Sequence, residues 1–453
     1  MTIRRREFLA GLLASPLAGT RGGEAGEYKN PDPTMHPGDN LTLRLGIIGY
    51  GSRGEELVRT MKEAELNVEF RGISEVFGQR MERGLAAAGP GARGYTNYRD
   101  LLDADDLDAV IIATPDHLHA GMASDAAKRG KHIYLEKCMA CTLEEAKELR
   151  AAVKNSGVVF QLGHQGRQRD LNLKARELVQ SNVLGKITLI ETTTNRNDDR
   201  EGWKRADGET ASRENIDWEL FQGPGRERHP FSIERYYGWR NFWAYGTGMA
   251  GELLTNEFDM VNSIMDLGIP ETAVASGGLY DHSDGREVPD LFQAAFEYPS
   301  RSLTLLYSGT LANGIPRGTL FMGRDASLEL GRILSVWADS NSIKYKSRIE
   351  AGTMDTSTPF VNYMKDQNQL DAVSSATSKY FADRGLVYTD KDGRQQSTTC
   401  LHLEEWLDCI RSGRMPSCHV DRGFEEAVIA VMASMSLREG RKVRWDPDKE
   451  TII

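Results

Sequence analysis

The chain has 453 residues, which favours at least two domains over a single hydrophobic core. Its hydrophobic content of 40% and charged content of 27% are typical of a soluble globular protein. The net charge of −10, with no basic block beyond the first few residues, argues against nucleic acid or an anionic membrane surface as a partner.

Two further classes are disfavoured by simple counts. No stretch of about 18 consecutive apolar residues occurs, so we expect no membrane-spanning helix. The five cysteines are few and odd in number, which is unlike a disulfide framework. Cys138 and Cys141 have the spacing of a redox motif, but the following Thr-Leu-Glu-Glu reads as a helix start without it. We expect no metal site.

Residues 1–40 are expected to be an export signal and a linker. Arg5 and Arg6 precede a Glu-Phe-Leu triplet and a short, weakly hydrophobic run, which looks like a twin-arginine signal. A fortuitous basic start is the alternative. Twin-arginine export moves proteins that are already folded, often with a cofactor inside, so we expect an exported, periplasmic protein.

Residues 41–165 are expected to form a dinucleotide-binding domain. The apolar run 43-LRLGIIG-49 leads into the glycine loop 49-GYGSRG-54, and a helical pattern follows. In this context G-x-G-x-x-G is a dinucleotide fingerprint: Gly49 permits the tight turn, Gly51 lets the backbone approach a pyrophosphate, and Gly54 lets helix and strand pack closely. The helix N-terminus offers free N–H groups to the phosphates.

Glu75 ends a second expected strand, residues 68–75, about 20 positions after the glycine loop. A carboxylate there can hold the hydroxyl groups of the adenosine ribose. It also repels a 2′-phosphate, so NAD is favoured over NADP.

Three more strands alternate with helical stretches, which predicts a parallel sheet whose ligands bind beyond the carboxyl ends of the strands. Polar residues gather at those ends, and position alone makes them site candidates: Thr114, Pro115, His119, Glu136, Lys137, His164 and Gln165.

These motifs together resemble the glucose–fructose oxidoreductase / inositol dehydrogenase (Gfo/Idh/MocA) family over roughly residues 43–330: the glycine loop, A-T-P-x-x-x-H at 113–119, and E-K at 136–137. The resemblance implies a nucleotide-binding domain, then an α/β domain with a large open sheet. It also implies a functional lysine, matched here by Lys137, although Cys138 replaces the usual proline and leaves the local turn open. The expected cofactor-binding residues are Gly49, Gly51, Ser52, Arg53, Gly54, Glu75, Thr114, Pro115, His119, Glu136 and Gln165.

Residues 166–396 are expected to form the second domain. Strand-like runs dominate from residue 187 and suggest a mostly antiparallel sheet. We therefore predict an α/β fold: an N-terminal Rossmann-type doubly wound parallel sheet plus a C-terminal α/β domain with a large, mostly antiparallel open sheet. Helices cover only one face of such a sheet, so we expect a homo-oligomer, dimer or tetramer, through the other. Residues 331–396 lack clear periodicity and read as an excursion over the surface, while 397–453 return as helices packing on the body.

The segment 233–254 is unusually aromatic. Tyr236 and Trp239 are candidates to stack on the C–H faces of a sugar, and Arg240 to reach its hydroxyls or a carboxylate. A plain core cluster is the alternative, because the six rings of the segment cannot all face a ligand.

The stretch 251-GELLTNEFDMVN-262 reads as a helix with Glu252, Asn256 and Asp259 on one face. Family members often carry Asp and, four residues later, His at the positions of Glu252 and Asn256, both facing the nicotinamide. Asn cannot carry a proton, so the resemblance leaves acid–base work to Lys137, then Glu252, with His164 a possible substitute for the missing imidazole. We expect burial and the positive nicotinamide to lower the pKa of Lys137.

The chemistry implied is NAD-dependent hydride transfer at a CH–OH carbon of a sugar, glycoside or cyclitol held by Lys137, Tyr236, Trp239, Arg240, Glu252, Asn256 and Asp259. Export favours tightly bound NAD that is recycled within each cycle. Two alternatives remain open: a redox-neutral NAD-dependent glycoside hydrolase and a non-catalytic carbohydrate or NAD sensor.

Overall fold

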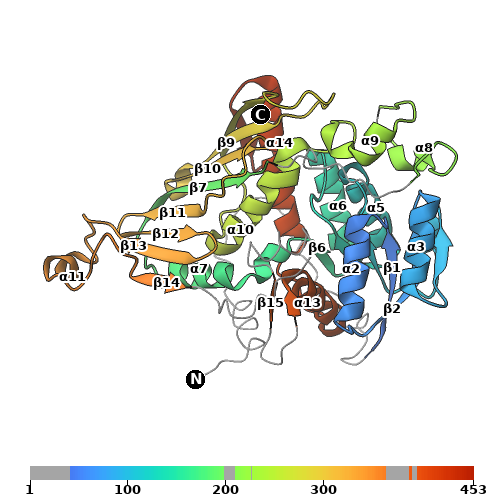
Figure 1. The fold of residues 1–453 in the computed structure, drawn as a ribbon, viewed down its shortest axis with the longest axis horizontal. Coiled ribbons are helices and arrows are strands. Elements are labelled where there is room, and N and C mark those ends of the chain that lie inside the picture. Colours follow the sequence, from blue (N-terminus) through green and yellow to red (C-terminus); the bar gives the residue numbers. More distant parts are fainter. Residues whose placement is uncertain (1–40, 198–209, 226, 364–386, 390–394) are drawn as a thin grey trace.

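The computed structural model describes residues 41–197, 210–225, 227–363, 387–389 and 395–453 (Figure 1). The expected export signal and linker in residues 1–40 lie outside the described residues.

The N-terminal domain is built on a six-stranded parallel sheet, as predicted. The strand order is β3-β2-β1-β4-β5-β6, in which the chain starts in the middle and winds outward in both directions. The strands are β1 (Leu43–Ile48), β2 (Val68–Ser74), β3 (Arg93–Tyr95), β4 (Ala109–Ile112), β5 (His132–Leu135) and β6 (Phe160–Leu162). Strands β4, β5 and β6 are fully buried and β1 nearly so, since helices cover both faces, whereas the edge strand β3 is largely exposed.

Helices join successive strands of this sheet: α2 (Ser52–Glu63), α3 (Gly78–Ala88), α4 (Tyr98–Leu102), α5 (Asp116–Lys128) and α6 (Leu143–Ser156). A late helix, α13 (Thr398–Ser412), also packs here: Leu403 and Trp406 share a buried cluster with residues of β1 and α2. Helix α13 therefore packs on the first domain although it lies late in the chain (Figure 1).

The second domain carries a ten-stranded sheet in the order β14-β13-β12-β11-β7-β10-β9-β8-β17-β18. All neighbours in it are antiparallel except β7 and β10, which confirms the expected mostly antiparallel sheet. The strands are β7 (Ile187–Asn195), β8 (Thr272–Gly278), β9 (Leu291–Tyr298), β10 (Leu303–Thr310), β11 (Thr319–Gly323), β12 (Ala326–Leu330), β13 (Leu334–Ala338), β14 (Val361–Tyr363), β17 (Val443–Asp446) and β18 (Thr451–Ile452).

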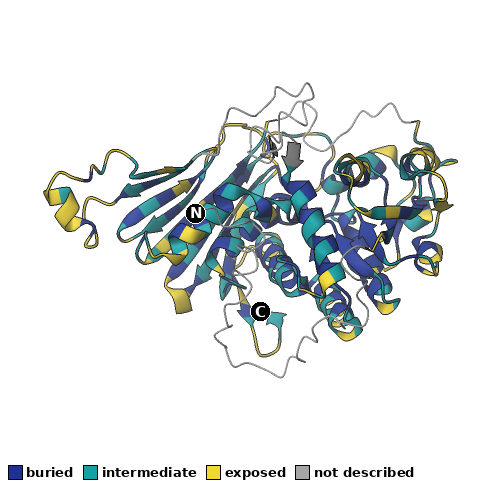
Figure 2. Cartoon of the chain, turned by 90° about the horizontal axis from the view of Figure 1, so that it is seen from below, coloured by how far each residue is buried: buried dark blue, intermediate teal, exposed yellow. Residues whose placement is uncertain are grey.

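Helices α7 (Asp170–Gln180), α10 (Thr255–Met265) and α14 (Val420–Glu439) pack on one face of this large sheet (Figure 1). Side chains along β10 alternate between buried and half-buried, which is the pattern of a sheet covered on one face. Figure 2 shows buried residues following the strands and the helices beside them, with exposed residues at the tip that carries α11 (Lys346–Glu350).

Residues 331–396 differ in part from the expected surface excursion. The run 334-LSVWA-338 forms β13, with Leu334, Val336 and Ala338 buried, and β14 extends the sheet beyond it. The alternation is present in the sequence, but five residues are too few to stand out from a polar surrounding. Residues 364–386 and 390–394 lie outside the described part of the chain.

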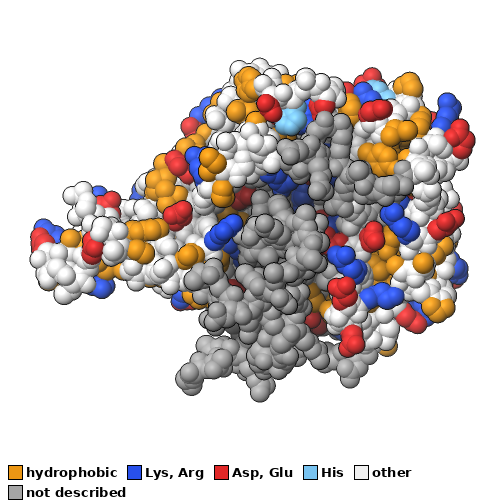
Figure 3. Space-filling view, viewed as in Figure 1, with side chains coloured by type: hydrophobic (Ala, Val, Ile, Leu, Met, Phe, Trp, Pro, Cys, Tyr) orange, Lys and Arg blue, Asp and Glu red, His pale blue; other side chains and the backbone are white. Residues whose placement is uncertain are grey.

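The remaining elements are short: η2 (Gln165–Gln168), α8 (Trp218–Gln222), α9 (Ile233–Tyr237), η3 (Trp239–Asn241), the π-helix η4 (Ala250–Leu254), η5 (Pro299–Arg301), β15 (Val387–Thr389) and β16 (Gln395–Ser397). Among the described residues, no helix combines the length and the apolar character needed to cross a bilayer. On the face shown in Figure 3, acidic and basic side chains of the described residues are interspersed.

Candidate active site

The glycine loop joins β1 to α2 with the geometry that a dinucleotide needs. Gly49 has a φ of 89°, and a Cβ on it would lie 2.8 Å from the carbonyl oxygen of Ala113. A Cβ on Gly54 would lie 2.2 Å from the carbonyl oxygen of Gly49, so any side chain at this position would prevent α2 from packing against the turn. Both positions therefore require glycine, for the two reasons the fingerprint predicts.

Gly51 provides the test of whether a pyrophosphate fits. A Cβ there would meet only one side-chain atom within 4 Å, Arg80 Nη1 at 3.4 Å. The loop backbone at the start of α2 is thus open toward a guanidinium group, and a doubly anionic pyrophosphate suits both neighbours. Ser52 is the first residue of α2, so its backbone N–H belongs to the unpaired first turn.

Glu75 lies at the carboxyl end of β2, beside the glycine loop. Its carboxylate accepts hydrogen bonds from the backbone N–H groups of Tyr50 (2.7 Å), Val76 (2.8 Å) and Phe77 (3.1 Å). These bonds fix the side chain at the position where the ribose of a dinucleotide lies. One lone pair of a carboxylate that can accept about four bonds remains for a hydroxyl.

Arg53 connects the glycine loop with the ends of two other strands. Its Nε donates to Glu136 Oε1 at 2.7 Å, and its Nη2 donates to Gln165 Oε1 at 3.4 Å. Burial lowers the pKa of Arg53, but the charges of Glu136 and Glu56 outweigh it and the net shift is upward. The three predicted cofactor residues Arg53, Glu136 and Gln165 are thus brought together, with Arg53 as the link.

His119 lies beneath the predicted site. Its two ring nitrogens are 2.8 Å from the Thr114 carbonyl and 2.6 Å from the Cys138 carbonyl, and the residue is 1% exposed. Burial lowers its pKa, against the two carbonyl contacts, which raise it. His119 therefore braces the ends of β4 and β5, and its placement does not support the predicted direct contact with a cofactor. Thr114 and Pro115 occupy the β4 end itself.

Lys137 lies at the carboxyl end of β5, in a pocket of charge. Its Nζ donates to Glu252 Oε2 at 3.0 Å, and Arg240 Nε donates to the same oxygen at 3.0 Å. The Glu252 side chain is 3% exposed, whereas those of Lys137 and Arg240 are 17% and 33% exposed. A buried carboxylate thus holds two cations that reach toward the surface. The peptide bond between Lys137 and Cys138 is cis.

Glu252 lies in the π-helix η4, and its backbone carbonyl also takes part in the contacts of this group. The carbonyl oxygen accepts from two side chains, Lys137 Nζ at 3.2 Å and Asn256 Nδ2 at 3.1 Å. Asn256 and Lys137 are therefore neighbours, as their predicted roles require.

The electrostatics correct one expectation. Burial does lower the pKa of Lys137, but the negative charge of Glu252, aided by Asp116, outweighs burial and the net shift is upward. For Glu252, burial raises the pKa, but Arg240 and Lys137 outweigh it and lower it to about 2. These shifts favour a cationic Lys137 and an anionic Glu252, which makes Glu252 a weak base and an effective anchor.

Asp116, which the sequence did not single out, completes this group. It is 2% exposed, and its Oδ2 accepts from Thr247 Oγ1 at 3.1 Å. Burial and the charge of Glu252 raise its pKa well above the ordinary value, and a hydrogen bond to Glu252 contributes. Glu252 Oε1 is buried with no partner from the described hydrogen bonds, and the raised pKa of Asp116 favours a protonated carboxyl that can donate to it. We call Lys137, Glu252, Arg240 and Asp116 the cleft cluster.

His164 and Asp259 belong to a different buried group, which we call the joint cluster: His164, Glu426, Arg167 and Asp259. His164 Nε2 pairs with the Glu426 carboxylate, and Arg167 donates to Asp259 from Nη2 (2.6 Å) and Nε (2.9 Å). Burial lowers the pKa of His164, but Glu426 and Asp259 outweigh it and raise it. All four side chains are at most 9% exposed. Their placement does not support contact of His164 or Asp259 with a substrate.

Tyr236 and Trp239 also lie away from an open site. They are 4% and 9% exposed and belong to a buried aromatic cluster with Phe77, Ile216, Trp218, Phe221, Phe242 and Tyr245. The alternative of a core cluster therefore describes these rings, and of the segment's predicted sugar contacts only Arg240 reaches the cleft cluster. A single sequence gives no sign of which rings pack on which domain.

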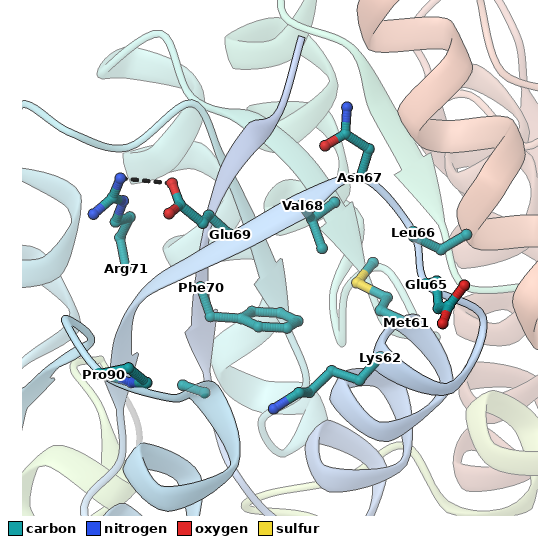
Figure 4. A pocket seen from close by; sticks show the side chains of 11 residues that line it. Met61, Lys62, Glu65, Leu66, Asn67, Val68, Glu69, Phe70, Arg71 and Pro90 are labelled. Atoms are coloured by element: carbon teal, nitrogen blue, oxygen red, sulfur yellow. Dashed lines mark hydrogen bonds and ion pairs between the residues drawn. The ribbon is translucent and has the colours of Figure 1, made fainter. Parts of the chain in front are cut away.

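A cavity of about 410 Å³ lies elsewhere, between the end of α2 and the start of β2 (Figure 4). Its lining includes Lys62, Asn67, Phe70 and Pro90, and none of the predicted site residues. It opens at the amino ends of the parallel strands, where doubly wound sheets do not bind their cofactors. We assign it no role. No group of acidic, histidine and cysteine side chains among the described residues is arranged to hold a metal ion.

Comparison with known proteins adds to this geometry. Residues 43–164 match the Gfo/Idh/MocA model described as "Oxidoreductase family, NAD-binding Rossmann fold", and residues 224–444 match the model of its "C-terminal alpha/beta domain". The uncharacterized oxidoreductase YrbE of Bacillus subtilis is 32% identical over 33% of this chain and 43% of its own length. The 2,7-anhydro-N-acetylneuraminate hydratase of Escherichia coli is 26% identical over 64% of this chain and 67% of its own length.

Solved structures share the fold. A levoglucosan dehydrogenase in complex with NADH and levoglucosan superimposes with a TM-score of 0.65 over 89% of this chain and 99% of its own, at 18% identity. The WlbA dehydrogenase of Bordetella pertussis, in complex with NADH and UDP-GlcNAcA, gives 0.64 over 90% and 99%, at 15% identity.

Proposed function

We propose, from the premise that the chain belongs to the Gfo/Idh/MocA oxidoreductase family, that it transfers a hydride between NAD and a CH–OH carbon of a sugar, glycoside or cyclitol. The observation that carries the proposal is the contact of Lys137 Nζ with Glu252 Oε2, 3.0 Å, at the strand edge that bears the glycine loop. Sugar ligands appear in the names of family relatives and neighbours, which supports the substrate class.

NAD, when bound, supplies the atom that accepts or returns the hydride. The chain's own residues do the rest. Gly51 and the first turn of α2 would receive the pyrophosphate, and Glu75 would hold the ribose. Lys137 Nζ binds the substrate oxygen and moves its proton.

The upward shift in the pKa of Lys137 sets the direction in which it works most readily. As a cation it donates a proton to a carbonyl oxygen that is being reduced. In the oxidation direction Lys137 must first lose a proton, and the positive charge of an oxidised nicotinamide held at this site would favour that loss. Glu252 fixes Lys137 and Arg240 with one oxygen, so a substrate meets both cations in a set geometry.

We also propose that the NAD stays bound and is recycled within each catalytic cycle. The twin-arginine-like N-terminus supports this, since no diffusible NAD pool is expected in the periplasm. The reduced cofactor would be reoxidised either by reducing a second sugar or by reducing the product formed from the first. Oligomerisation through the uncovered face of the ten-stranded sheet is part of the same proposal, supported by the one-sided helix cover.

The glycoside hydrolase scheme is the second candidate. It oxidises a glycoside at C3, removes the C2 proton, eliminates the aglycone, adds water and reduces the product back. The C2 step needs a further base. His164 is paired and buried in the joint cluster, and the pKa of Glu252 is lowered to about 2, so neither residue suits this role. The plain oxidoreductase is favoured because it requires no such base. The sensor alternative is supported by Asn256 in place of a histidine.

One experiment separates the three. The full chain is purified, its bound nucleotide identified, and sugars and nitrophenyl glycosides are added while the absorbance of reduced nicotinamide is followed. An oxidoreductase changes that absorbance with at least one sugar, and the hydrolase releases nitrophenol without net change. Tight sugar binding without either signal supports the sensor. Absence of any bound or bindable nucleotide contradicts the proposal.

A further inference from the structure

One chain segment from outside the parallel sheet crosses the cofactor end of the first domain. Residues 210–223 and 231–245, which we call the clasp, carry most of the buried aromatic cluster. On one side the clasp pairs with the residues that follow Glu75. Asp217 N–H donates to the Val76 carbonyl at 2.9 Å, Gly78 N–H donates to the Asn215 carbonyl at 3.1 Å, and Phe77 and Ile216 form an antiparallel bridge.

On its other side the clasp is fixed to the start of α5, beyond Thr114 and Pro115. His117 N–H donates to the Tyr245 carbonyl at 3.3 Å, and His117 Nε2 donates to the Phe221 carbonyl at 2.8 Å. The His117 ring also packs edge-on against Tyr245 and Phe221, with centroids 5.2 and 5.8 Å apart. The clasp thus bridges the loops that follow β2 and β4.

Those two loops flank the adenosine in a doubly wound dinucleotide domain, with the acidic residue of β2 on the ribose. A segment anchored on both of them lies on the adenosine side of the site that this rule predicts. The anchors are well buried: Phe77 is 0% and Tyr245 0% exposed. Opening the clasp would expose these rings to water, which is costly.

Arg80 places a cation between the clasp and the glycine loop. Its guanidinium carbon lies 5.4 Å from the ring centre of Tyr236 and 5.8 Å from those of Phe77 and Tyr237. Its Nη1 is the atom 3.4 Å from the position of a Cβ on Gly51. The clasp rings therefore hold a guanidinium over the loop that receives the pyrophosphate.

We propose that the clasp and Arg80 close over the adenosine-diphosphate half of the bound dinucleotide and slow its release. The inference rests on the proposed function, since a recycled cofactor must outlast many turnovers. It adds Arg80 and a segment that follows the first family domain to the cofactor site, neither of which the glycine fingerprint indicates.

The test measures NADH release from the full chain, by fluorescence after mixing the loaded protein with excess NAD. Arg80→Ala is expected to speed release about tenfold or more, the equivalent of ~1.4 kcal/mol. Arg83→Ala is the matched control, because Arg83 is on the same helix with a 42% exposed side chain and a 3.9 Å ion pair to Glu55. Equal release rates in wild type and Arg80→Ala, or equal acceleration by both variants, would overturn the proposal.

A second variant separates the clasp from a simple phosphate contact. Ile216→Ala removes a buried side chain from the cluster that the clasp shares with Phe77 and leaves Arg80 in place, so it should also speed release. If Arg80→Ala accelerates release and Ile216→Ala does not, Arg80 acts only as a phosphate ligand. The proposal that the clasp slows release is then rejected. Circular dichroism and the melting temperature check that Ile216→Ala remains folded.

Hydrogen exchange gives an independent measurement on the unmodified protein. NADH should slow amide exchange in residues 210–223 while leaving β9 and β10 unchanged. No slowing in the clasp would contradict the proposal even if NADH binds. Failure to bind any dinucleotide would instead reject the proposed function, and binding without sugar oxidation would leave the clasp standing.

Discussion

The cleft cluster and the joint cluster each contain a carboxylate from the same helical face, but they differ in how exposed their cations are. Glu252 and Asp259 are two turns apart along η4 and α10, and each is a buried carboxylate held by cations. Glu252 anchors two side chains that are partly exposed. Asp259 binds an arginine that is 9% exposed and also donates to the Ser417 carbonyl, near the start of α14.

The difference is one of access. A charge pair that leaves cations reachable can bind and protonate a ligand, whereas a fully enclosed pair can only fix the elements around it. The joint cluster links β6 and η2 of the first domain with α10 and α14 of the second. We therefore assign chemistry to the cleft cluster and domain attachment to the joint cluster.

Lys137→Met tests the assignment of chemistry to the cleft cluster and should have the largest effect. We expect hydride transfer to a reactive sugar to fall by roughly 10²–10⁴, because the proton carrier is lost. NADH affinity should be retained, since Gly51, Glu75 and Arg53 are untouched. Stopped-flow absorbance measures the rate and fluorescence titration the affinity. A variant with wild-type rate would move the chemistry elsewhere.

Arg167→Ala tests the structural side. It leaves Asp259 as a buried carboxylate without its cation, which costs about 3–5 kcal/mol of unfolding free energy. Urea unfolding checks the value, with Lys174→Ala as control, because the Lys174–Glu177 pair is at the surface and worth less than about 1 kcal/mol. The folded variant should keep the hydride transfer rate. Loss of rate without loss of stability would place the joint cluster in the active site.

Glu252→Gln should alter both the stability of the fold and the pKa of Lys137. It removes the anion between Lys137 and Arg240, so we expect a loss of about 1–3 kcal/mol in stability and a lower pKa for Lys137. Because the pKa of Glu252 is depressed from 4.5 to about 2, its stabilisation is complete above 4.5 and is lost as the pH falls toward 2.

The stability gap between wild type and Glu252→Gln should therefore narrow as the pH is lowered from about 6 to about 3. Urea titrations at the two pH values measure it. A gap that widens on acidification would mean that Glu252 is protonated in the folded protein.

Asp116→Asn should have the smallest effect. If Asp116 carries a proton, an amide can replace it as donor to Glu252 and as acceptor from Thr247, so the change should stay under about 1 kcal/mol at low pH. A raised folded pKa means that the carboxyl stabilises the fold below its ordinary value and loses this contribution as the pH rises. The variant should thus gain on wild type toward alkaline pH, which thermal melts at several pH values can detect.

The sequence was informative where a feature is local. The glycine loop, Glu75 at the end of β2, and Lys137 at the end of β5 are each specified within a few residues, and the structure places all three at one edge of the parallel sheet. Strand alternation likewise predicted the two kinds of sheet.

The misplacements have a common physical cause. Which partner a side chain meets depends on elements far along the chain: Asp259 meets Arg167, and His164 meets Glu426, 262 residues away. Helical spacing placed Glu252 and Asp259 on one face correctly, but it contains no information on where the cleft ends along that face. Asp116 could not be predicted from the A-T-P-x-x-x-H pattern, because it occupies one of the unspecified positions of that motif.

The most direct test of the central claim is a single turnover with the nucleotide already bound. Wild-type protein and Lys137→Met, both loaded with NAD and folded to the same extent, are mixed with a sugar that the wild type oxidises, and the appearance of reduced nicotinamide is timed. We predict a fast phase in wild type and one slower by roughly 10²–10⁴ in the variant. Equal phases would contradict the assignment of the proton to Lys137.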